Sequence, residues 1–163
     1  MRVEITIGKL LRAWGKNLSI AESCTGGLVS DHITNVPGSS VYFEGSIVCY
    51  SNGAKVRHLH IPLKTLERFG PVSSQTAGRM AQGVRKAFHT TFGLSTTGVA
   101  GPTGGTKKTP VGTVFIGFSN GKRTWVKKFD LKGSRREIKK EAAEKALSFL
   151  QEYLTRHARH YKR

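Results

Sequence analysis

Hydrophobic and polar positions along the chain alternate between the spacing of strands and the spacing of helices. Residues 18–21 form a short apolar stretch, and after a glycine-containing turn the apolar residues of 28–33 follow a helical period. Residues 41–50 are rich in aromatic and β-branched side chains, which predicts a second strand. A helix is predicted over residues 54–59, with Asn52 as its N-cap. The unit of strand, turn and helix therefore occurs twice.

The rest of the chain continues this alternation. Asn120-Gly121 is the strongest short-range signal for a hairpin, and Ser134 to Glu137 fits a capping box at the start of a last helix. The other expected elements are a first helix over 4–14 closed by Gly15, a short helix over 62–69, a longer helix capped by Ser73 or Ser74, a strand over 94–97, and hairpin strands over 111–119 and 124–131.

Strands that alternate with helices predict a layered α/β domain with a mostly parallel mixed sheet and one antiparallel hairpin. At 163 residues the chain has the length of one domain, so we assign residues 1–163 to a single unit with a frayed tail over 156–163. The turns after residues 21, 50 and 97 all follow strands. Because ligands in such sheets bind beyond the carboxyl ends of the strands, these turns are expected to converge on one site.

The charge is the most unusual feature of the composition. The 27 Lys and Arg residues outnumber the 10 Asp and Glu residues, for a formal net charge of +17, and the excess is densest towards the C-terminus. Such a balance favours anionic partners. Nonspecific binding of nucleic acid by this basic surface is one reading and a solvated charged surface is the other, because no known nucleic-acid-binding motif accompanies the charge.

The two cysteines and the N-terminus indicate a reduced compartment. Cys24 and Cys49 are an isolated pair in a chain without a visible export signal, which favours two free thiols over a disulfide. No apolar run approaches the roughly 20 residues of a membrane-spanning helix. We therefore expect a soluble cytoplasmic protein with no membrane partner.

Three side chains near the predicted site could carry nucleophilic chemistry. Ser23 lies in the turn between a strand and a helix, where a hydroxyl is exposed as a nucleophile or serves only as a cap. No Ser-His-Asp set accompanies it, so Lys55 is the candidate base, provided that its amine is neutral. Tyr50 ends the preceding strand and is placed to relay a proton or to hold the lysine. When each residue is considered alone, without the proposed site, Lys55 is expected to be a solvated surface residue and Tyr50 a packed strand residue.

Glycine-rich turns supply the candidate anion-binding groups. Backbone N–H groups near Thr25, Gly26 and Gly27 are expected to face an anion, and the loop from Gly98 to Gly105, which matches neither a Walker A nor a dinucleotide-binding pattern, is either an anion nest or a plain connection. Arg135 suits a phosphate by charge and position. His58 and His60 offer only two metal ligands, so neither a metal nor a cofactor is expected.

Several motifs together resemble one family, the nicotinamide-nucleotide amidohydrolases, which form the C-terminal domain of CinA, the competence/damage-inducible protein. They are A-E-S-C-T-G-G at 21–27, P-G-S-S at 37–40, Y-S-N-G-A-K at 50–55, G-V-A-G-P-T-G-G at 98–105 and P-V-G-T-V at 110–114. The match runs in order from about residue 5 to residue 155. The resemblance implies a three-layer α/β/α sandwich and hydrolysis of nicotinamide mononucleotide to nicotinic acid mononucleotide and ammonia.

Carried over by position, the resemblance gives Ser23 the role of nucleophile, Lys55 that of general base, and Tyr50 a place beside them. Cys24 is the rival nucleophile one residue away. Gly98, Gly101, Gly104 and Gly105 of the glycine loop, with Arg135, would hold the phosphate and ribose of a mononucleotide. We also expect a homo-oligomer.

The chain departs from the family pattern at Gly53, where Glu is frequent, and at Ser134, where Asp is frequent. These two differences are expected to affect substrate binding more than the chemical step. The chain also reads as the stand-alone form, without the pyrophosphatase-like N-terminal domain of longer relatives. The alternative function from another class is a basic, non-catalytic nucleic-acid-binding or competence-related protein.

Overall fold

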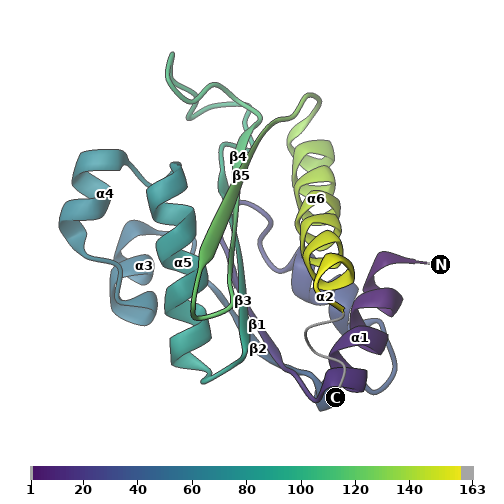
Figure 1. The fold of residues 1–163 in the computed structure, drawn as a ribbon. Coiled ribbons are helices and arrows are strands. Elements are labelled where there is room, and N and C mark those ends of the chain that lie inside the picture. The colour runs from purple at the N-terminus through teal and green to yellow at the C-terminus, as the bar shows by residue number, and fades with distance from the viewer. Residues whose placement is uncertain (1, 159–163) are drawn as a thin grey trace.

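The computed structural model describes residues 2–158, and these residues form three layers with a sheet in the middle (Figure 1). The elements in chain order are α1 (Val3–Trp14), β1 (Leu18–Glu22), α2 (Leu28–Thr34), the 3-10 turn η1 (Ser39–Val41), β2 (Phe43–Val48), α3 (Asn52–Leu59), α4 (Leu63–Phe69), α5 (Ser74–Ala87), β3 (Phe92–Gly98), β4 (Thr113–Ser119), β5 (Thr124–Asp130) and α6 (Arg135–Arg156).

The sheet has five strands in the order β2-β1-β3-β4-β5. β1 pairs in parallel with β2 and β3, and β4 runs antiparallel to both of its neighbours. Four strands therefore point the same way and β4 alone is reversed. This arrangement confirms the predicted mixed, mostly parallel sheet with an antiparallel hairpin.

Helices cover both faces of the sheet. α1, α2 and α6 lie on one side and α3, α4 and α5 on the other, as Figure 1 shows. α5 packs directly on β1, β3, β4 and β5, whereas α6 packs on β3, β4 and the two N-terminal helices. The sandwich implied by the family resemblance is confirmed.

The larger of the two hydrophobic cores fills the space between the sheet and α6. Its centre is aromatic: the ring centroids of Phe118 and Tyr153 lie 4.4 Å apart, and Phe92 and Trp125 pack beside them. The smaller core lies under α3, α4 and α5 and includes Met80. Burial on both faces of the central strands explains why β1 and β3 read as continuous buried runs.

Helix capping agrees with the sequence at three points. Ser73 caps α5, Ser134 and Glu137 form the full capping box of α6, and Gly15 ends α1 in the left-handed conformation with φ of 59°. The predicted tail begins at Arg156, the last residue of α6, and residues 159–163 lie outside the described part of the chain.

The predicted N-cap of α3 is wrong by one residue. Asn52 is the first helical residue, and Ser51, in extended conformation, accepts a hydrogen bond from the Ala54 N–H at 3.1 Å. A hydroxyl one position earlier reaches that N–H, so Ser51 takes the capping role.

The outer ends of three strands differ from the pattern-based ones. The strand predicted over 41–50 is shortened to β2, because its first residue belongs to η1. β4 begins at Thr113 rather than at 111, and β5 ends at Asp130 rather than at 131.

The turn of the hairpin agrees with the prediction. Ser119 pairs with Thr124, so the loop holds the four residues between the predicted strands. The Asn120 side chain accepts hydrogen bonds from the Lys122 and Arg123 N–H groups and stabilises this turn.

Membrane spanning is not supported by any helix within residues 2–158, none of which combines the length and apolar character that a crossing requires.

Candidate active site

The carboxyl ends of the three parallel strands bring the predicted site residues together. Glu22, the last residue of β1, is paired with Val48 of β2 on one side and with Thr96 of β3 on the other. The segments that follow these strands therefore begin at the same edge of the sheet, as the sequence predicted. Ser23 comes directly after β1, and Tyr50 follows β2.

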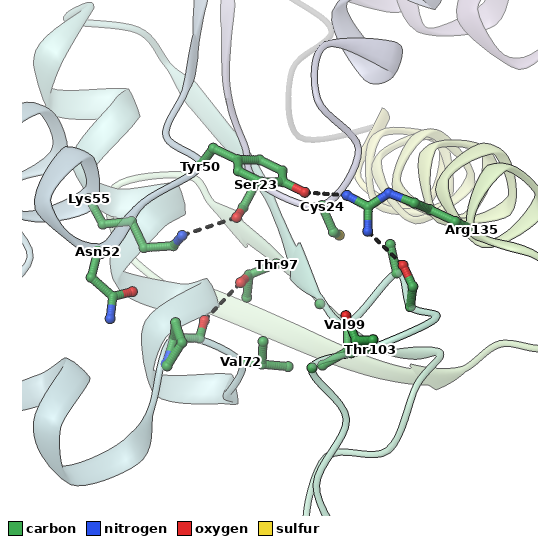
Figure 2. A pocket seen from close by; sticks show the side chains of 15 residues that line it. Ser23, Cys24, Tyr50, Asn52, Lys55, Val72, Thr97, Val99, Thr103 and Arg135 are labelled. Atoms are coloured by element: carbon green, nitrogen blue, oxygen red, sulfur yellow. Dashed lines mark hydrogen bonds between the residues drawn. The ribbon is translucent and has the colours of Figure 1, made fainter.

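Lys55 and Ser23 are in direct contact. The Nζ atom of Lys55 donates to the Oγ atom of Ser23 at 3.0 Å and to the carbonyl oxygen of Cys49, also at 3.0 Å. Figure 2 shows the two side chains directed towards each other. The lysine reaches the serine because α3 follows β2 after a short connection and places Lys55 on its buried side.

Burial determines the electrostatic state of this amine. The Lys55 side chain is 2% exposed, and loss of hydration lowers its pKa from the usual 10.5. No carboxylate forms an ion pair with it among the described residues. Burial thus shifts the Lys55 amine towards its neutral form, which is the form that a general base needs.

Cys24 is less suited to be the nucleophile than its position suggests. Its thiol is 4% exposed, and burial raises its pKa to about 12, so the reactive thiolate is disfavoured. Burial likewise raises the pKa of Cys49. Both cysteines are free thiols.

Tyr50 and Arg135 form a bridge across the edge of the site. The Arg135 guanidinium donates to the Tyr50 hydroxyl and to the carbonyl oxygen of Gly101. Figure 2 shows Arg135 reaching over from α6 towards the tyrosine ring. The bridge thereby joins the segment between β2 and α3, the glycine loop and the start of α6. The Tyr50 hydroxyl is engaged by Arg135, and no hydrogen bond joins it to Lys55 within residues 2–158.

A cavity of about 260 Å³ lies between these groups. Ser23, Lys55, Tyr50 and Arg135 line it, together with Gly98, Gly101 and Gly104 of the predicted glycine loop. No aspartate or glutamate is among its lining residues, and two of them are basic, so the cavity suits an anionic ligand. Cys24, the rival nucleophile, also lines the cavity. The sequence assigns no role in the site to the other lining residues, which are Asn52, Pro71, Val72, Thr97, Val99, Ala100 and Thr103.

Four residues of the predicted site do not line the cavity. Thr25 is fully buried, and its hydroxyl contacts the Glu22 carboxylate at 2.6 Å. The N–H of Gly27 donates to the same carboxylate, and the N–H of Gly26 donates to the Ser23 carbonyl oxygen. The fourth residue, Gly105, lies against Val111.

The two departures from the family pattern have simple structural settings. Gly53 is exposed on α3, and the nearest atom to an added Cβ would be an Arg57 nitrogen at 3.6 Å. Ser134 caps α6. Neither residue lines the cavity.

Metal binding has no support in residues 2–158, where no three His, Cys, Asp or Glu side chains come together as a ligand set. His58 lies in the last turn of α3 and His60 caps it, so the H-x-H pattern falls at a helix end.

The fold and site together define an α/β/α domain with a buried lysine against a serine at the sheet edge. The chain belongs to the CinA C-terminal domain family, whose model matches residues 1–154. The predicted family is thus confirmed.

Two relatives support this membership. A CinA-like protein of Kosmotoga olearia is 48% identical over 152 residues, which cover 93% of this chain and 37% of that protein. A CinA-like protein of Endomicrobium trichonymphae is 46% identical over 147 residues, or 90% of this chain and 34% of that protein. The chain therefore spans about a third of the length of these relatives.

Solved structures agree with the fold over nearly the whole chain. The competence damage-inducible protein A (ComA) of Klebsiella pneumoniae superposes with a TM-score of 0.91 at 27% identity, covering 94% of this chain and 95% of that one. The competence/damage inducible protein CihA of Agrobacterium tumefaciens gives a TM-score of 0.86 at 33% identity, with 94% and 95% covered.

Proposed function

We propose that this protein is an amidohydrolase that converts nicotinamide mononucleotide to nicotinic acid mononucleotide and ammonia. The observation that supports the proposal most strongly is the 3.0 Å contact between Lys55 Nζ and Ser23 Oγ, with the lysine almost completely buried. The family resemblance of the motifs that hold these two residues supplies the substrate.

The chemical step follows from a neutral Lys55. In that state its lone pair accepts the Ser23 proton across the 3.0 Å contact, while one of its N–H bonds donates to the Cys49 carbonyl. The Ser23 oxygen then attacks the carboxamide carbon and a tetrahedral oxyanion forms. The Lys55 ammonium returns its proton to the leaving nitrogen, the C–N bond breaks, and ammonia departs.

Water completes the cycle. It attacks the resulting ester on Ser23 as Lys55 takes one of its protons. The bond between the acyl carbon and the Ser23 oxygen breaks, the acid leaves, and the proton returns to the serine. Lysine thus serves as base and acid in both halves of the reaction.

The cavity fits an anionic substrate with a reacting amide. Arg135 provides positive charge, and the backbone of the loop from Gly98 to Gly104 forms one wall. In the present arrangement Arg135 donates to Tyr50 and Gly101, so a bound phosphate would share or replace these partners. Tyr50 would then change its contacts on binding, which gives it a role at the edge of the site.

The direct test is ammonia release from nicotinamide mononucleotide by the purified protein. We expect release by the wild type, loss in Ser23→Ala, and retention in Cys24→Ala. Ammonia release by Ser23→Ala at the wild-type rate would contradict the proposal, as would loss in Cys24→Ala alone.

A further inference from the structure

The carboxylate of Glu22 organises the turn that carries Ser23. The residue is completely buried, yet both of its oxygens are saturated with donors from the segment that follows. One oxygen accepts from the Thr25 hydroxyl at 2.6 Å, the Gly27 N–H at 2.9 Å and the Val29 N–H at 3.1 Å. The other accepts from the N–H and the hydroxyl of Ser30, at 2.8 and 2.6 Å.

This arrangement consumes the N–H groups at the start of α2. The first N–H groups of a helix have no partner inside the helix and are the usual donors to an external anion. Here an internal carboxylate takes those of Val29 and Ser30, together with that of Gly27 before them. The start of α2 is therefore closed to a substrate.

The other backbone N–H groups of the turn differ in whether another residue accepts their hydrogen bond. Ser23 donates to the Thr96 carbonyl oxygen, and Gly26 donates to the Ser23 carbonyl oxygen. Within residues 2–158, the N–H groups of Cys24 and Thr25 donate to no other residue. They are also the two N–H groups that directly follow the serine, and Cys24 lines the cavity.

We infer that Glu22 is a positioning residue, which fixes the turn so that Ser23 faces Lys55 and the N–H group of Cys24, the residue of the pair that lines the cavity, serves as an oxyanion donor. The inference rests on the proposed function for the identity of the reaction. It replaces the expectation that N–H groups near Thr25, Gly26 and Gly27 face the anion.

The chemistry of the five contacts requires a carboxylate. All five partners donate, and an ionised carboxylate is a pure acceptor with two oxygens. A glutamine has the same shape but carries an NH₂ group in place of one carboxylate oxygen. The groups that donated to that oxygen would then face another donor, and their hydrogen bonds would be lost. The turn must then shift or rotate, which moves the serine and the following N–H groups with it.

The test compares Glu22→Gln with Ser30→Ala. The second variant removes one of the five contacts and leaves the Ser30 N–H bonded, so it is the matched control for a change in the cap of α2 alone. For amide hydrolysis we expect Glu22→Gln to lower kcat by about a hundredfold with KM changed by less than about threefold, as for loss of an oxyanion donor. Ser30→Ala should stay within about threefold of wild type in both constants. A wild-type kcat in Glu22→Gln, or an equal loss in Ser30→Ala, would overturn the inference.

A second variant covers the case in which Glu22→Gln fails to fold. Thr25→Val removes the hydroxyl contacts to Glu22 and Thr96 and keeps the shape of the side chain. Thr25 lies in the turn between Ser23 and α2, whereas Ser30 lies within α2, so this loss acts on the turn that carries the serine. It is expected to lower kcat about tenfold with KM unchanged, and an unchanged kcat would contradict the role of this network.

A serine-directed reagent separates this inference from the proposed substrate. With a small fluorophosphonate, the Ser23 oxygen bonds to phosphorus, the P–F bond breaks, fluoride leaves, and the serine proton passes to Lys55. Peptide mass spectrometry should find Ser23 labelled in the wild type, equally fast in Ser30→Ala, and at least about tenfold more slowly in Glu22→Gln. Labelling without hydrolysis of nicotinamide mononucleotide would refute the proposed substrate and leave the inference standing. Equal rates in wild type and Glu22→Gln, or no labelling of the wild type, would refute the inference.

Discussion

Lys55 Nζ lies 3.0 Å from Ser23 Oγ, although 32 positions of the chain separate the two residues. Two parallel strands create this contact, because β1 delivers the serine and β2 delivers the helix that carries the lysine to one edge of the sheet. The contact is the basis for the predictions on activity that follow.

Removal of either partner of this pair should abolish catalysis to a similar extent. We expect Ser23→Ala and Lys55→Met each to lower kcat by about a thousandfold or more, and the double variant to lose little beyond either single one, since residues that act as a unit are not additive. Steady-state ammonia release from the three variants measures this. Losses that multiply in the double variant would show that the two residues act independently.

Replacement of the neighbouring thiol should be tolerated. Because burial raises the Cys24 pKa to about 12, the thiol stays protonated near neutral pH and cannot compete with an activated serine. Cys24→Ala should therefore keep kcat/KM within about fivefold of wild type, the small loss reflecting a cavity next to Ser23. Inactivation by this substitution, in a variant with unchanged circular dichroism, would favour the thiol as nucleophile.

The activity should rise with pH as the Lys55 ammonium loses its proton. Burial lowers the Lys55 pKa from 10.5, and only the neutral amine can accept the serine proton. The kcat/KM profile should thus increase with pH and level off below 10.5. A kcat/KM that does not change with pH below 10.5, or that rises only around pH 10.5, would be incompatible with a buried lysine as base.

The same burial predicts how stability depends on pH. In the unfolded chain the lysine titrates near 10.5, and in the folded chain at a lower pH. Between these two pKa values the unfolded state binds more protons, so the free energy of unfolding increases as the pH rises through this window. Below the folded pKa both states are protonated and the contribution is constant.

Lys55→Met isolates this contribution. Urea unfolding of both proteins at a series of pH values should show the wild type gaining stability relative to Lys55→Met as the pH approaches 10.5. A difference that does not change with pH would mean that the lysine has the same pKa in both states.

The sheet and α5 meet too closely for a side chain at Gly93. A Cβ atom there would lie 2.1 Å from the Ala81 carbonyl oxygen and 2.8 Å from the Arg85 Cβ. Gly93→Ala should lower the free energy of unfolding by about 2 kcal/mol or more, because β3 and α5 must separate. Gly53→Ala is the matched control, since the nearest atom is 3.6 Å away, and it should unfold at the same or a higher urea concentration. Equal midpoints for Gly93→Ala and wild type would contradict this close packing.

The sequence predicts the order of elements well because strands and helices differ in hydrophobic period. The boundaries depend on single hydrogen bonds. Ser51 rather than Asn52 caps α3, and β2 starts only after Val41, which belongs to η1. Such choices are decided by which donor a side chain reaches in three dimensions.

The sequence predicts those residues of the candidate site to which a motif assigns a role. The sequence predicts Ser23, Lys55 and Arg135 as site residues, and all three line one cavity. Glu22 stands in the A-E-S-C-T-G-G motif, but the sequence gives it no role, because its five hydrogen-bond donors become visible only once the turn is folded. The basic surface remains a prediction of nucleic-acid binding, for which the test is binding of duplex DNA that weakens steeply as salt increases.

The most direct measurement of the central claim is the site of the covalent intermediate. Acid quenching of the protein during turnover of nicotinamide mononucleotide, followed by peptide mass spectrometry, should find the nicotinic acid mononucleotide acyl group as an ester on Ser23. In Lys55→Met the ester should be absent, because the serine is not activated. An acyl group on Cys24, or steady turnover by a protein whose Ser23 is replaced by alanine, would contradict the account.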